Sequence, residues 1–551
     1  MKIIVKLRNL CSVLFRRLPT DPRSAAILQH FGQPARIERL PIPIVVVTMQ
    51  CVEDPFYLGL FAVIARHLRR AHEARGGVTV ELAVQRSFNA GLQGGWSSFI
   101  AWTALLNRAI SRQWLTVFGA VSSRLAYRSN SFDPVGDAVD AWRSWHRWQE
   151  VRANKTLHNL VIDGTECGDL VADSYLRFRP SPRLDFDDPF ILYLLWQAHR
   201  DVRRARRYFT ERRPQVYLTS YTTYIQHGVG VRVALREGVR VLSFSNFQEF
   251  GKVLSLGDTF HTRNPVHYRR DFKALQGQSQ LLYEAQRQLE IRLSGGIDNV
   301  TSYMTASAYR ATSHVVPDVT GAVVIFLHDF YDSPHVYADL VFDDFWSWIC
   351  FTIDTLREAS IPFLVKPHPN QIALSDQVIS ELTLRYPQIR MVPSGVTSRQ
   401  LVAGGMACAV TVFGTIAHEM AYLGVPSIGC ARHPHISFDF CRTARDRASY
   451  AELLRTALAL RPNAAVLREQ ALQFYVMHNL AFSPDEIALR DAFIAAWRAC
   501  HDNQLPASEI ARGFDRLAAL PAFSVFIDSL LSGAPELASA TSRTSILVAP
   551  P

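Results

Sequence analysis

The fold class of this chain is decided by the stretch Met406-Ala-Cys-Ala-Val-Thr-Val-Phe-Gly-Thr-Ile-Ala-His-Glu-Met-Ala-Tyr-Leu-Gly-Val-Pro-Ser-Ile-Gly-Cys430. It reads as an apolar run, a glycine turn, a helix with one apolar face and a second turn that contains glycine and proline. This pattern predicts a buried strand that leads directly into a helix, the basic unit of a parallel α/β sheet.

The predicted helix begins at Gly414-Thr415, where unpaired backbone N–H groups and the positive end of the helix dipole face outward. Such a helix start can hold a phosphate group. Glu419 lies one turn later on the same helix face, where its carboxylate suits the hydroxyl groups of a ribose. The segment therefore indicates a nucleotide-sugar site, although an ordinary strand–helix unit whose glycine only makes the turn gives the same pattern.

A second signal lies upstream in Ile361-Pro-Phe-Leu-Val-Lys-Pro-His-Pro-Asn370, a short apolar strand that ends in Lys366 and His368. Prolines restrict the loop that carries these two side chains. Ligands of open α/β sheets bind beyond the carboxyl ends of the strands, so both side chains should project into the crevice that contains Thr415. We expect two cations and a helix start to meet at one anion; a solvated loop is the alternative.

These motifs resemble a known family. Its pattern is matched by Lys366-Pro-His-Pro369, Gly414-Thr415, Glu419 and Leu423-Gly-Val-Pro426, which are similar to the C-terminal half of bacterial GT-B glycosyltransferases that build capsules and other surface polysaccharides. The relatives include Kdo transferases of capsule initiation and, more distantly, sialyl- and polysialyltransferases, whose His-Pro pair contacts the phosphate of a CMP-sugar. Gly414-Thr415 stands where the sialyl families usually carry serines, so the resemblance does not specify CMP-sialic acid.

Two segments of the N-terminal half resemble the same family. Gly168-Asp-Leu-Val-Ala-Asp-Ser-Tyr-Leu-Arg177 is similar to a Gly-Asp-Leu-x-x-Asp-x-Tyr-Leu-Arg stretch of surface-polysaccharide proteins. The segment from Tyr224 to Val241 resembles their strand–helix–strand unit. Together the matches reach from about residue 161 to residue 454, and they specify the family better than the sugar.

The expected nucleotide-sugar site contains cationic, hydroxyl and backbone donors, because transfer of a sugar requires stabilisation of the departing phosphate. The expected binding residues are Lys366, His368, Gly414, Thr415, Glu419, His328 and Ser333. The last two belong to the segment that follows the first strand of the second domain and opens into the same cleft; a plain loop is the alternative there. We expect no metal and no cofactor other than the nucleotide-sugar substrate itself.

Inverting transfer also needs a base that removes a proton from the acceptor hydroxyl. Asp169 and Asp173 are the expected catalytic residues, with Asp163 and Glu166 behind them. A carboxylate that caps a turn or a helix start is the competing interpretation. If the transfer retains configuration, as the Kdo resemblance allows, a single general base is not required.

Three further motifs have more than one interpretation. His418 neighbours Glu419 but points about 100° away around the helix, which favours a packing role. Asp185-Phe-Asp187 matches the Asp-x-Asp metal motif of another glycosyltransferase fold, but Pro189 follows it, which indicates a helix start. Arg432-His-Pro-His435 repeats the His-Pro pair after the last strand, where it approaches the nucleotide or forms a surface turn.

Composition describes a folded protein with more than one domain. The chain has 551 residues, of which 48% are apolar and 20% are charged, so it is longer than one hydrophobic core usually spans. Its eight cysteines include no Cys-x-x-Cys pair. This spacing argues against a disulfide framework and a structural zinc site, and favours a reducing cytoplasm.

The net charge of +10 and the pI near 9.3 invite a nucleic-acid interpretation, but the basic residues are spread along the chain. The densest cluster, Arg200–Arg213, lies near the end of a predicted helix, where cations suit the helix dipole. We therefore expect no nucleic acid, and expect anionic lipid headgroups, a lipid-linked or polysaccharide acceptor and the nucleotide as partners. No apolar run is long enough to cross a bilayer, and residues 1–17 either lie on a membrane surface or dock as a terminal helix.

Two series of short apolar runs alternate with helical stretches and predict two Rossmann-like domains. The first series comprises Ile42–Thr48, Val78–Val84, Leu157–Ile162, Gln215–Thr219 and Val239–Phe244; the second comprises Ala322–Leu327, Ile361–Val365, Ile389–Val392, Ala407–Val412 and Ser427–Gly429. We expect an α/β chain of the GT-B fold, whose two Rossmann-like domains face a central cleft. The expected parts are an N-terminal extension (1–40), an acceptor-side domain (41–310), a nucleotide-sugar-binding domain (320–500) and a C-terminal helix with a flexible tail (501–551).

The expected function is that of a cytoplasmic GT-B glycosyltransferase, peripheral on the inner face of the membrane, which transfers a sugar from a nucleotide to a surface polysaccharide. Three alternatives remain at this point. A sugar-nucleotide epimerase and a CDP-polyol phosphotransferase would place a nucleotide on an equivalent helix. A non-catalytic protein of polysaccharide export or assembly is the third, because function belongs to the site and not to the fold.

Overall fold

The computed structural model describes residues 22–31, 44–49, 55–72, 79–84, 122–126, 133–179, 181–244, 249–256, 258, 265–299, 315–368, 371 and 373–532. The chain divides into two compact units: the first comprises residues 1–174, 186–261 and 484–539, and the second comprises residues 175–185, 262–483 and 540–551. These limits differ from the expected domain limits near residues 310 and 500, because the chain returns to the first unit at Pro484. The expected N-terminal basic segment and the tail from Gly533 lie outside the described residues.

The first unit is built on a sheet of six strands, in the order β3 (Ser122–Ala126), β2 (Thr79–Val84), β1 (Ile44–Met49), β6 (Val216–Thr219), β7 (Arg240–Ser243) and β8 (Lys252–Leu254). Neighbouring strands are parallel except β7 and β8. The order changes direction between β1 and β6, as in a Rossmann-like sheet. Four of the strands expected in the first series correspond to β1, β2, β6 and β7.

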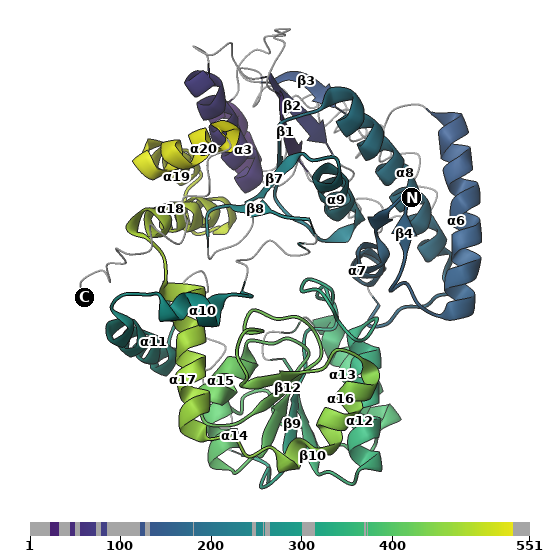
Figure 1. Cartoon of the computed structure of the whole chain (residues 1–551), viewed down its shortest axis with the longest axis vertical. Helices are drawn as coiled ribbons and strands as arrows, with labels where there is room; N and C mark the ends of the chain where they lie inside the picture. The colour runs from purple at the N-terminus through teal and green to yellow at the C-terminus, as the bar shows by residue number, and fades with distance from the viewer. Residues whose placement is uncertain are drawn as a thin grey trace. The chain divides into compact units, whose positions relative to one another are not determined.

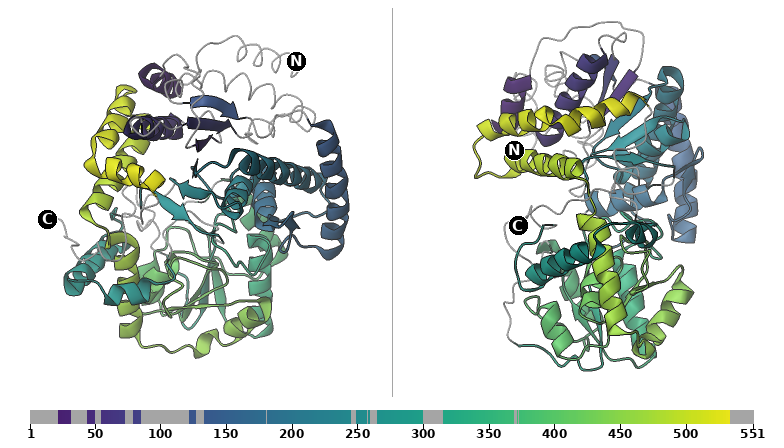
Figure 2. Two further views of the ribbon diagram at one scale, coloured as in Figure 1. Left: turned by 45° about the horizontal axis from the view of Figure 1, so that its top comes forward. Right: turned by 60° about the vertical axis from the view of Figure 1, so that its left-hand side comes forward.

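Helices from both ends of the chain cover one side of this sheet. They are α2 (Pro22–Phe31), α3 (Pro55–His72), α18 (Pro484–His501), α19 (Ser508–Ala519) and α20 (Pro521–Ser532), and they share one apolar core with β6 and β7. On the other side lie α8 (Pro189–Arg212) and α9 (Val229–Arg236), with α6 (Pro134–Asn154) packed outside α8. The views of Figure 2 show the same grouping of the C-terminal helices with α3.

The basic cluster near the end of α8 is paired within the unit. Arg203 binds Asp133, Asp137 and Asp140 at the start of α6, and Arg204 lies 2.9 Å from Asp137. These carboxylates neutralise much of the cluster, so it joins α6 to α8 and does not form a free anionic-ligand surface. The first residues of α8 agree with the expected helix start, because the Asp188 side chain accepts the N–H of Phe190 at 2.9 Å.

One expected strand of the first series is wrong. Within the segment 157–162 only β4 (Val161–Ile162) is extended, and it pairs antiparallel with β5 (Thr165–Glu166), apart from the main sheet. Asp163 and Gly164 form the turn between them with positive φ angles of 45° and 79°. Leu157, Leu160 and Ile162 are buried, whereas Val161 is exposed, so burial without pairing in the main sheet explains most of the pattern.

The second unit has a parallel sheet of five strands, in the order β10 (Phe363–Lys366), β9 (Val323–Phe326), β11 (Cys408–Val410), β12 (Ser427–Gly429) and β13 (Cys441–Thr443). Alternate residues of β9 point to opposite faces. Val323 and Ile325 join a core with α12 (Phe345–Glu358), α13 (Ala373–Arg385) and α16 (Arg447–Arg455), whereas Val324 and Phe326 join one with α14 (Ser398–Ala403) and α15 (Ile416–Tyr422). Both faces of the sheet are therefore covered.

Two details of the second sheet differ from the expected series. The segment Ile389–Val392 contributes only one bridge, in which Met391 pairs parallel with Val365. β13 adds an edge strand that the apolar pattern does not indicate, because Cys441-Arg-Thr443 is short and largely polar. A third apolar core joins α10 (Tyr268–Lys273), α11 (Gln278–Leu293) and α17 (Ala464–Tyr475) to α15.

The chain has the expected α/β class and the two Rossmann-like units of which a GT-B fold is composed. Among the described residues, none of the helices combines the length and hydropathy that crossing a membrane requires.

Candidate functional site

The second unit contains a pocket at the carboxyl ends of its central strands. It is lined by residues that follow β9, β10 and β11, by the start of α15, and by the segment before α14: Phe326, Leu327, His328, Lys366, Pro367, His368, Ser394, Gly395, Val396, Thr397, Ser398, Thr411, Gly414, Thr415, Ile416 and Glu419. The strand order changes direction between β9 and β11, and a crevice at such a point is where ligands of open α/β sheets bind. Six of the seven expected binding residues line this one pocket.

Lys366, the last residue of β10, provides the positive charge of the pocket. Its side chain is buried, and its Nζ donates to the backbone oxygen of Ser394 at 3.0 Å. Burial lowers the pKa of Lys366 to about 8, because a low-dielectric surrounding disfavours the charged form. The ammonium group therefore still predominates at neutral pH, and it is held in place by one hydrogen bond with two donor positions left for a ligand.

Two histidines of the pocket lie near each other. The rings of His328 and His368 are nearly parallel, with centroids 6.5 Å apart, and His328 also packs against Phe345 and Phe413. Burial lowers the pKa of His328 to about 3, and burial lowers the pKa of His368 as well. Both imidazoles are thus neutral at neutral pH, so the expectation of two cations is wrong: Lys366 carries the charge, and His368 offers a neutral hydrogen-bonding ring.

Gly414 is a position of the pocket with little room for a side chain. Its N–H donates to Thr411 Oγ1 at 3.2 Å, and a Cβ added here would lie 2.8 Å from Thr411 Oγ1 and 3.2 Å from His328 Nε2. Any larger residue would push against the pocket floor. Thr415 follows as the exposed N-cap of α15 without a side-chain cap hydrogen bond, and the first N–H groups of a helix have no intrahelical partner.

Glu419 is a fully buried carboxylate that lines the pocket from α15. Arg292 of α11 lies behind it, with Nη1 3.5 Å from Glu419 Oε1, and Arg292 also pairs with Asp298 at 2.7 Å. Tyr475 of α17 donates to the same Asp298 at 2.7 Å. This buried network fixes the orientation of Glu419, so the carboxylate is preorganised.

Ser333 is the expected binding residue that does not line the pocket. It is buried, and its N–H donates to Asp332 Oδ1 at 2.8 Å. The turn that holds it, from Asp329 to His335, is tied down from α13, because Ser375 Oγ donates to Asp329 Oδ1 at 2.8 Å. Ser333 thus lies in this turn and not among the residues that line the pocket, and its binding role stays a prediction.

The two expected catalytic aspartates belong to the first unit and lie on α7 (Gly168–Phe178). Both oxygens of Asp169 are engaged by Arg232 of α9, at 2.7 and 2.5 Å. Such a bidentate pair with a largely buried guanidinium fixes the carboxylate in place, which favours the structural interpretation of Asp169. Asp173 is buried on the same helix.

The remaining histidine motifs are internal. His418 is buried and packs against Phe474 at 5.0 Å between ring centroids, as the helical spacing indicated. His433 and His435 are 1% and 0% exposed and lie outside the pocket lining, so neither the nucleotide contact nor the surface turn is right. Burial lowers the pKa of His433 to about 3.

Several pocket residues carry no sequence signal. The segment Ser394–Ser398 lines the pocket before α14, and nothing in its composition marks it as a site. Arg292 and Asp298 reach the site from α11 and the loop after it, over a hundred positions before Glu419. A buried carboxylate requires a partner, and only the fold shows that Glu419 is buried and that Arg292 is its partner.

No protein-family model matches the chain, and no curated protein sequence matches it. Solved structures that resemble it include the KpsC β-Kdo 2,4-transferase of Thermosulfurimonas dismutans, with a TM-score of 0.27 and 11% identity over 47% of this chain and 79% of that one. Another is the spinosyn rhamnosyltransferase SpnG, with a TM-score of 0.23 and 12% identity over 80% and 97% of the two chains. A third is a UDP-GlcNAc 2-epimerase of Methanocaldococcus jannaschii, with a TM-score of 0.24 and 7% identity over 78% and 98%. At such values these likenesses carry no argument about the activity of this chain.

Proposed function

We propose that this chain is a glycosyltransferase that uses a nucleotide-activated sugar to extend a bacterial surface polysaccharide or a lipid-linked acceptor. The observation that carries the proposal is the meeting of Lys366, His368, Thr415 and Glu419 in one pocket, at the point where the strand order of the second sheet reverses. A cation, a helix start and a carboxylate at such a point suit the phosphate and the ribose of a nucleotide.

Each group has a defined part in this proposal. The Lys366 ammonium and the first turn of α15 hold the phosphate oxygens and stabilise the charge that develops on them when the sugar leaves. His368 and His328, both neutral, supply hydrogen bonds to the leaving phosphate. Glu419, held by Arg292, accepts hydrogen bonds from the ribose hydroxyl groups.

Nucleotide binding is the first test. Thermal unfolding of the full chain is measured with CMP, CDP, UDP and GDP, because a ligand that binds only the folded state raises its stability. We expect nucleotides of one base class to raise the unfolding temperature. Lys366→Gln and Glu419→Gln should each weaken the affinity for that nucleotide by about 10- to 100-fold, which is the effect of losing one charge-assisted hydrogen bond.

Matched controls separate the pocket from general effects of charge. Lys273→Gln on α10 and Glu469→Gln on α17 remove the same charges from exposed positions of the same unit. They should leave the affinity unchanged. Absence of a shift with every nucleotide, or equal weakening in the control variants, would refute the proposed site.

The reaction type is tested with the nucleotide-sugar that the binding assay selects. A transferase releases the nucleotide only in proportion to acceptor glycan, whereas an epimerase changes the sugar without acceptor, and a CDP-polyol phosphotransferase releases CMP. NMR of the donor with and without acceptor separates these outcomes. The catalytic role of Asp169 is the alternative to its structural role: if it holds, Asp169→Asn binds the nucleotide, keeps its stability and does not transfer the sugar.

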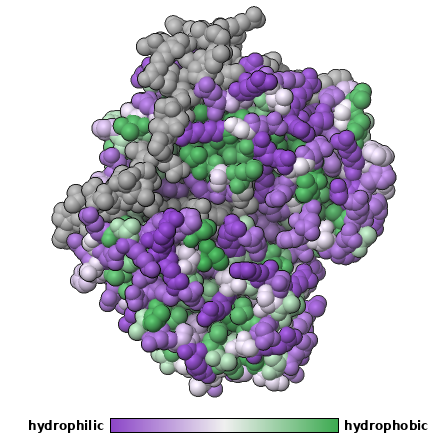
Figure 3. All heavy atoms as spheres, viewed as in Figure 1, coloured by the Kyte–Doolittle hydropathy of each residue, from purple (hydrophilic) through white to green (hydrophobic). Residues whose placement is uncertain are grey.

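We also propose that α6 places the enzyme on an anionic membrane surface. Its buried face contains Asp140 and Ser144, while Val135, Val139, Trp142 and Trp145, at helical spacing, are 75, 43, 64 and 49% exposed. An exposed apolar stripe marks an interaction surface, and tryptophan is favoured at the membrane interface. Figure 3 shows apolar side chains among hydrophilic ones along the edge of the surface where α6 lies.

Vesicle co-sedimentation tests this membrane contact. The wild-type chain should pellet with vesicles that contain phosphatidylglycerol, and the double variant Trp142→Ala with Trp145→Ala should remain in the supernatant. Tyr283→Ala with Leu384→Ala, which removes two apolar side chains that are 71 and 80% exposed on other helices, is the control. Equal pelleting of both double variants would exclude α6 as the membrane contact.

A further inference from the structure

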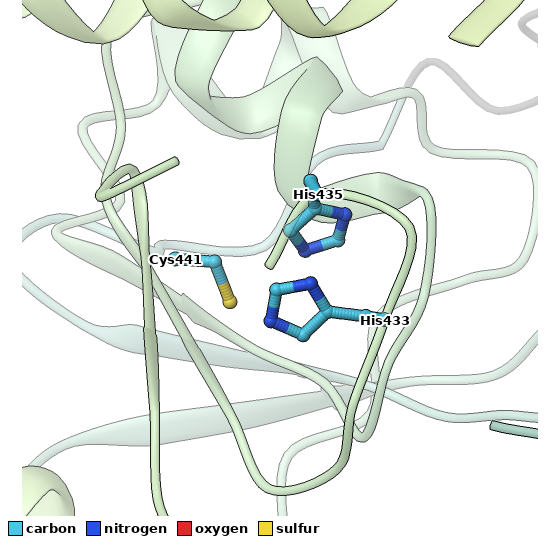
Figure 4. A group of neighbouring side chains, drawn as sticks. All are labelled: His433, His435 and Cys441. Carbon is cyan, nitrogen blue, oxygen red and sulfur yellow. The ribbon is translucent and has the colours of Figure 1, made fainter. Parts of the chain in front are cut away.

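A buried cluster of two imidazoles and a thiol lies outside the nucleotide pocket. It comprises His433 and His435, in the loop after β12, and Cys441, the first residue of β13. One ligand atom of each residue lies within 4.8 Å of the others. Figure 4 shows the two rings stacked and the thiol directed toward them.

The hydrogen bonds around this cluster do not satisfy its nitrogen atoms. His433 Nδ1 and both ring nitrogens of His435 have no hydrogen-bond partner among the described residues, although both side chains are buried. Buried polar groups without a partner are costly and call for an explanation such as an ion. Among the described residues, the remaining ring nitrogen, His433 Nε2, has Thr443 as its partner, with Oγ1 at 2.6 Å.

Packing alone does not explain the arrangement. The rings of His433 and His435 stack at 3.7 Å between centroids, and His435 stacks on Phe440 at 5.1 Å. An aromatic or aliphatic side chain would fill this apolar space without nitrogen atoms to satisfy. The choice of two imidazoles beside a thiol therefore indicates a chemical requirement for their lone pairs.

We propose that His433, His435 and Cys441 bind a thiophilic divalent transition metal of the zinc class. Imidazole nitrogen and thiolate sulfur are the donors that zinc prefers, whereas calcium and magnesium require oxygen ligands. Binding forms one sulfur–metal bond and two nitrogen–metal bonds, and the proton of the Cys441 thiol passes to solvent. A water molecule would take the fourth position, as in other three-ligand zinc sites, and the Thr443 hydroxyl bonded to His433 Nε2 would orient the ring.

The position of the cluster gives the metal a structural role. The residues from Cys430 to Phe440 connect β12 to β13, and the metal would join this connection to the edge strand. His435 packs on Phe474 of α17 at 5.6 Å, and His418 of α15 packs on the same ring at 5.0 Å. The metal thereby supports the helix that carries Glu419 without reaching the nucleotide pocket.

Cobalt titration is the test, because cobalt(II) occupies zinc sites and a cobalt–thiolate bond produces an intense near-ultraviolet absorption band. The untagged full chain is stripped with a chelator and titrated with Co²⁺. We expect one equivalent per chain, a thiolate band, and displacement by Zn²⁺. Cys441→Ser should abolish the band, and His435→Gln should weaken binding by at least roughly 10- to 100-fold, the loss that even an outer partner of a metal ligand causes.

The matched control is Cys350→Ser, which changes another buried cysteine of the same unit and should leave the cobalt titration unchanged. The nucleotide pocket has no cysteine among its lining residues, so a band that needs Cys441 cannot arise there. If the variants fail to fold, alkylation of the wild-type chain with and without Zn²⁺ is the test, measured by peptide mass spectrometry. Zn²⁺ should slow the alkylation of Cys441 and leave the alkylation of Cys350 unchanged. Absence of a stoichiometric metal, or a thiolate band that persists in Cys441→Ser, overturns the proposal.

Discussion

At the scale of single residues, the pKa of Lys366 predicts how nucleotide binding depends on pH. The ammonium form binds phosphate, and it is lost as the pH rises through about 8. We therefore expect the affinity to be nearly constant from pH 6 to 7 and to fall by up to about tenfold per pH unit above 8, the limit for one linked proton. Calorimetric titration at several pH values across this range measures the nucleotide affinity.

Lys366→Gln provides the control for this dependence, since it removes the titrating group and keeps a polar side chain. Its affinity should be lower and should not change between pH 7 and pH 9. A wild-type affinity that stays constant up to pH 9.5 would mean that the Lys366 charge is not used.

The Asp169–Arg232 pair predicts a change in stability. Arg232 is only 13% exposed and Asp169 25%, so Asp169→Asn leaves a buried guanidinium without its counter-charge. We expect the free energy of unfolding to fall by about 1–3 kcal/mol, the cost of an unsatisfied buried charged partner. Urea unfolding measures it.

Asp187→Asn is the matched control, because Asp187 pairs with Arg152 and Lys155 at a surface where it is 55% exposed. Exposed pairs contribute about 0–1 kcal/mol. Equal losses in both variants would contradict the structural role of Asp169, and unchanged stability with abolished sugar transfer would support its catalytic role.

At the scale of secondary-structure elements, Arg292 joins α11 to α15. It lies against two fully buried carboxylates, Glu419 and Asp298. Arg292→Met would leave both without this cation, and breaking a buried charge network typically costs about 3–5 kcal/mol. We expect a loss of this size in urea unfolding, together with weaker nucleotide binding, because Glu419 loses its orientation.

The exposed Arg287 on the same helix provides the comparison, since its ion pair among the described residues is with Glu284, one turn away. Arg287→Met should leave the free energy of unfolding nearly unchanged, because exposed ion pairs contribute little. A similar stability for both variants would show that the network does not hold Glu419.

The elements also show how far the sequence predicts this structure. Apolar runs identify the central strands of both sheets, because a strand buried on two faces must be continuously apolar. The rule does not predict the edge strand β13, since an edge needs less apolar surface. It also overpredicts the segment around Met391, which forms a single bridge. The pairing of β4 with β5 depends on a turn at Asp163-Gly164, which the apolar pattern cannot distinguish from a parallel strand.

The candidate site, too, can be predicted from the sequence only in part. Its strand-end and helix-start residues are recognisable, because the order of elements in a parallel sheet places them at one edge. Two properties depend on three-dimensional burial instead: the neutral state of His328 and His368, and the cluster formed by His433, His435 and Cys441. Neither the neutral state of the histidines nor this cluster can be derived from the spacing of residues along the chain.

At the scale of the whole molecule, the core of the first unit is shared between its early helices and its last ones. Phe514 of α19 is fully buried and packs on Phe56 of α3 and Phe31 of α2, and Gly59 allows this close approach. Phe514→Ala should therefore lower the free energy of unfolding by about 3–5 kcal/mol. Val525→Ala on α20, at a side chain that is 58% exposed, should change it by less than about 0.5 kcal/mol.

Hydrogen exchange locates this effect. Amides of α3 should lose protection in Phe514→Ala, while those of β9 and β11, which belong to the second unit, should keep it. Uniform loss of protection in both units would contradict a core confined to the first.

The return of the chain at Pro484 has a consequence for biosynthesis. A ribosome makes the polypeptide from its N-terminus, so β1, β2, β6 and β7 emerge long before α18, α19 and α20. Until translation has passed residue 532, this side of the newborn sheet has only its early helices α2 and α3, whereas the later unit is already almost fully translated. We therefore expect the first unit to complete its core only after the second has been translated, and to expose apolar surface that favours aggregation in the meantime.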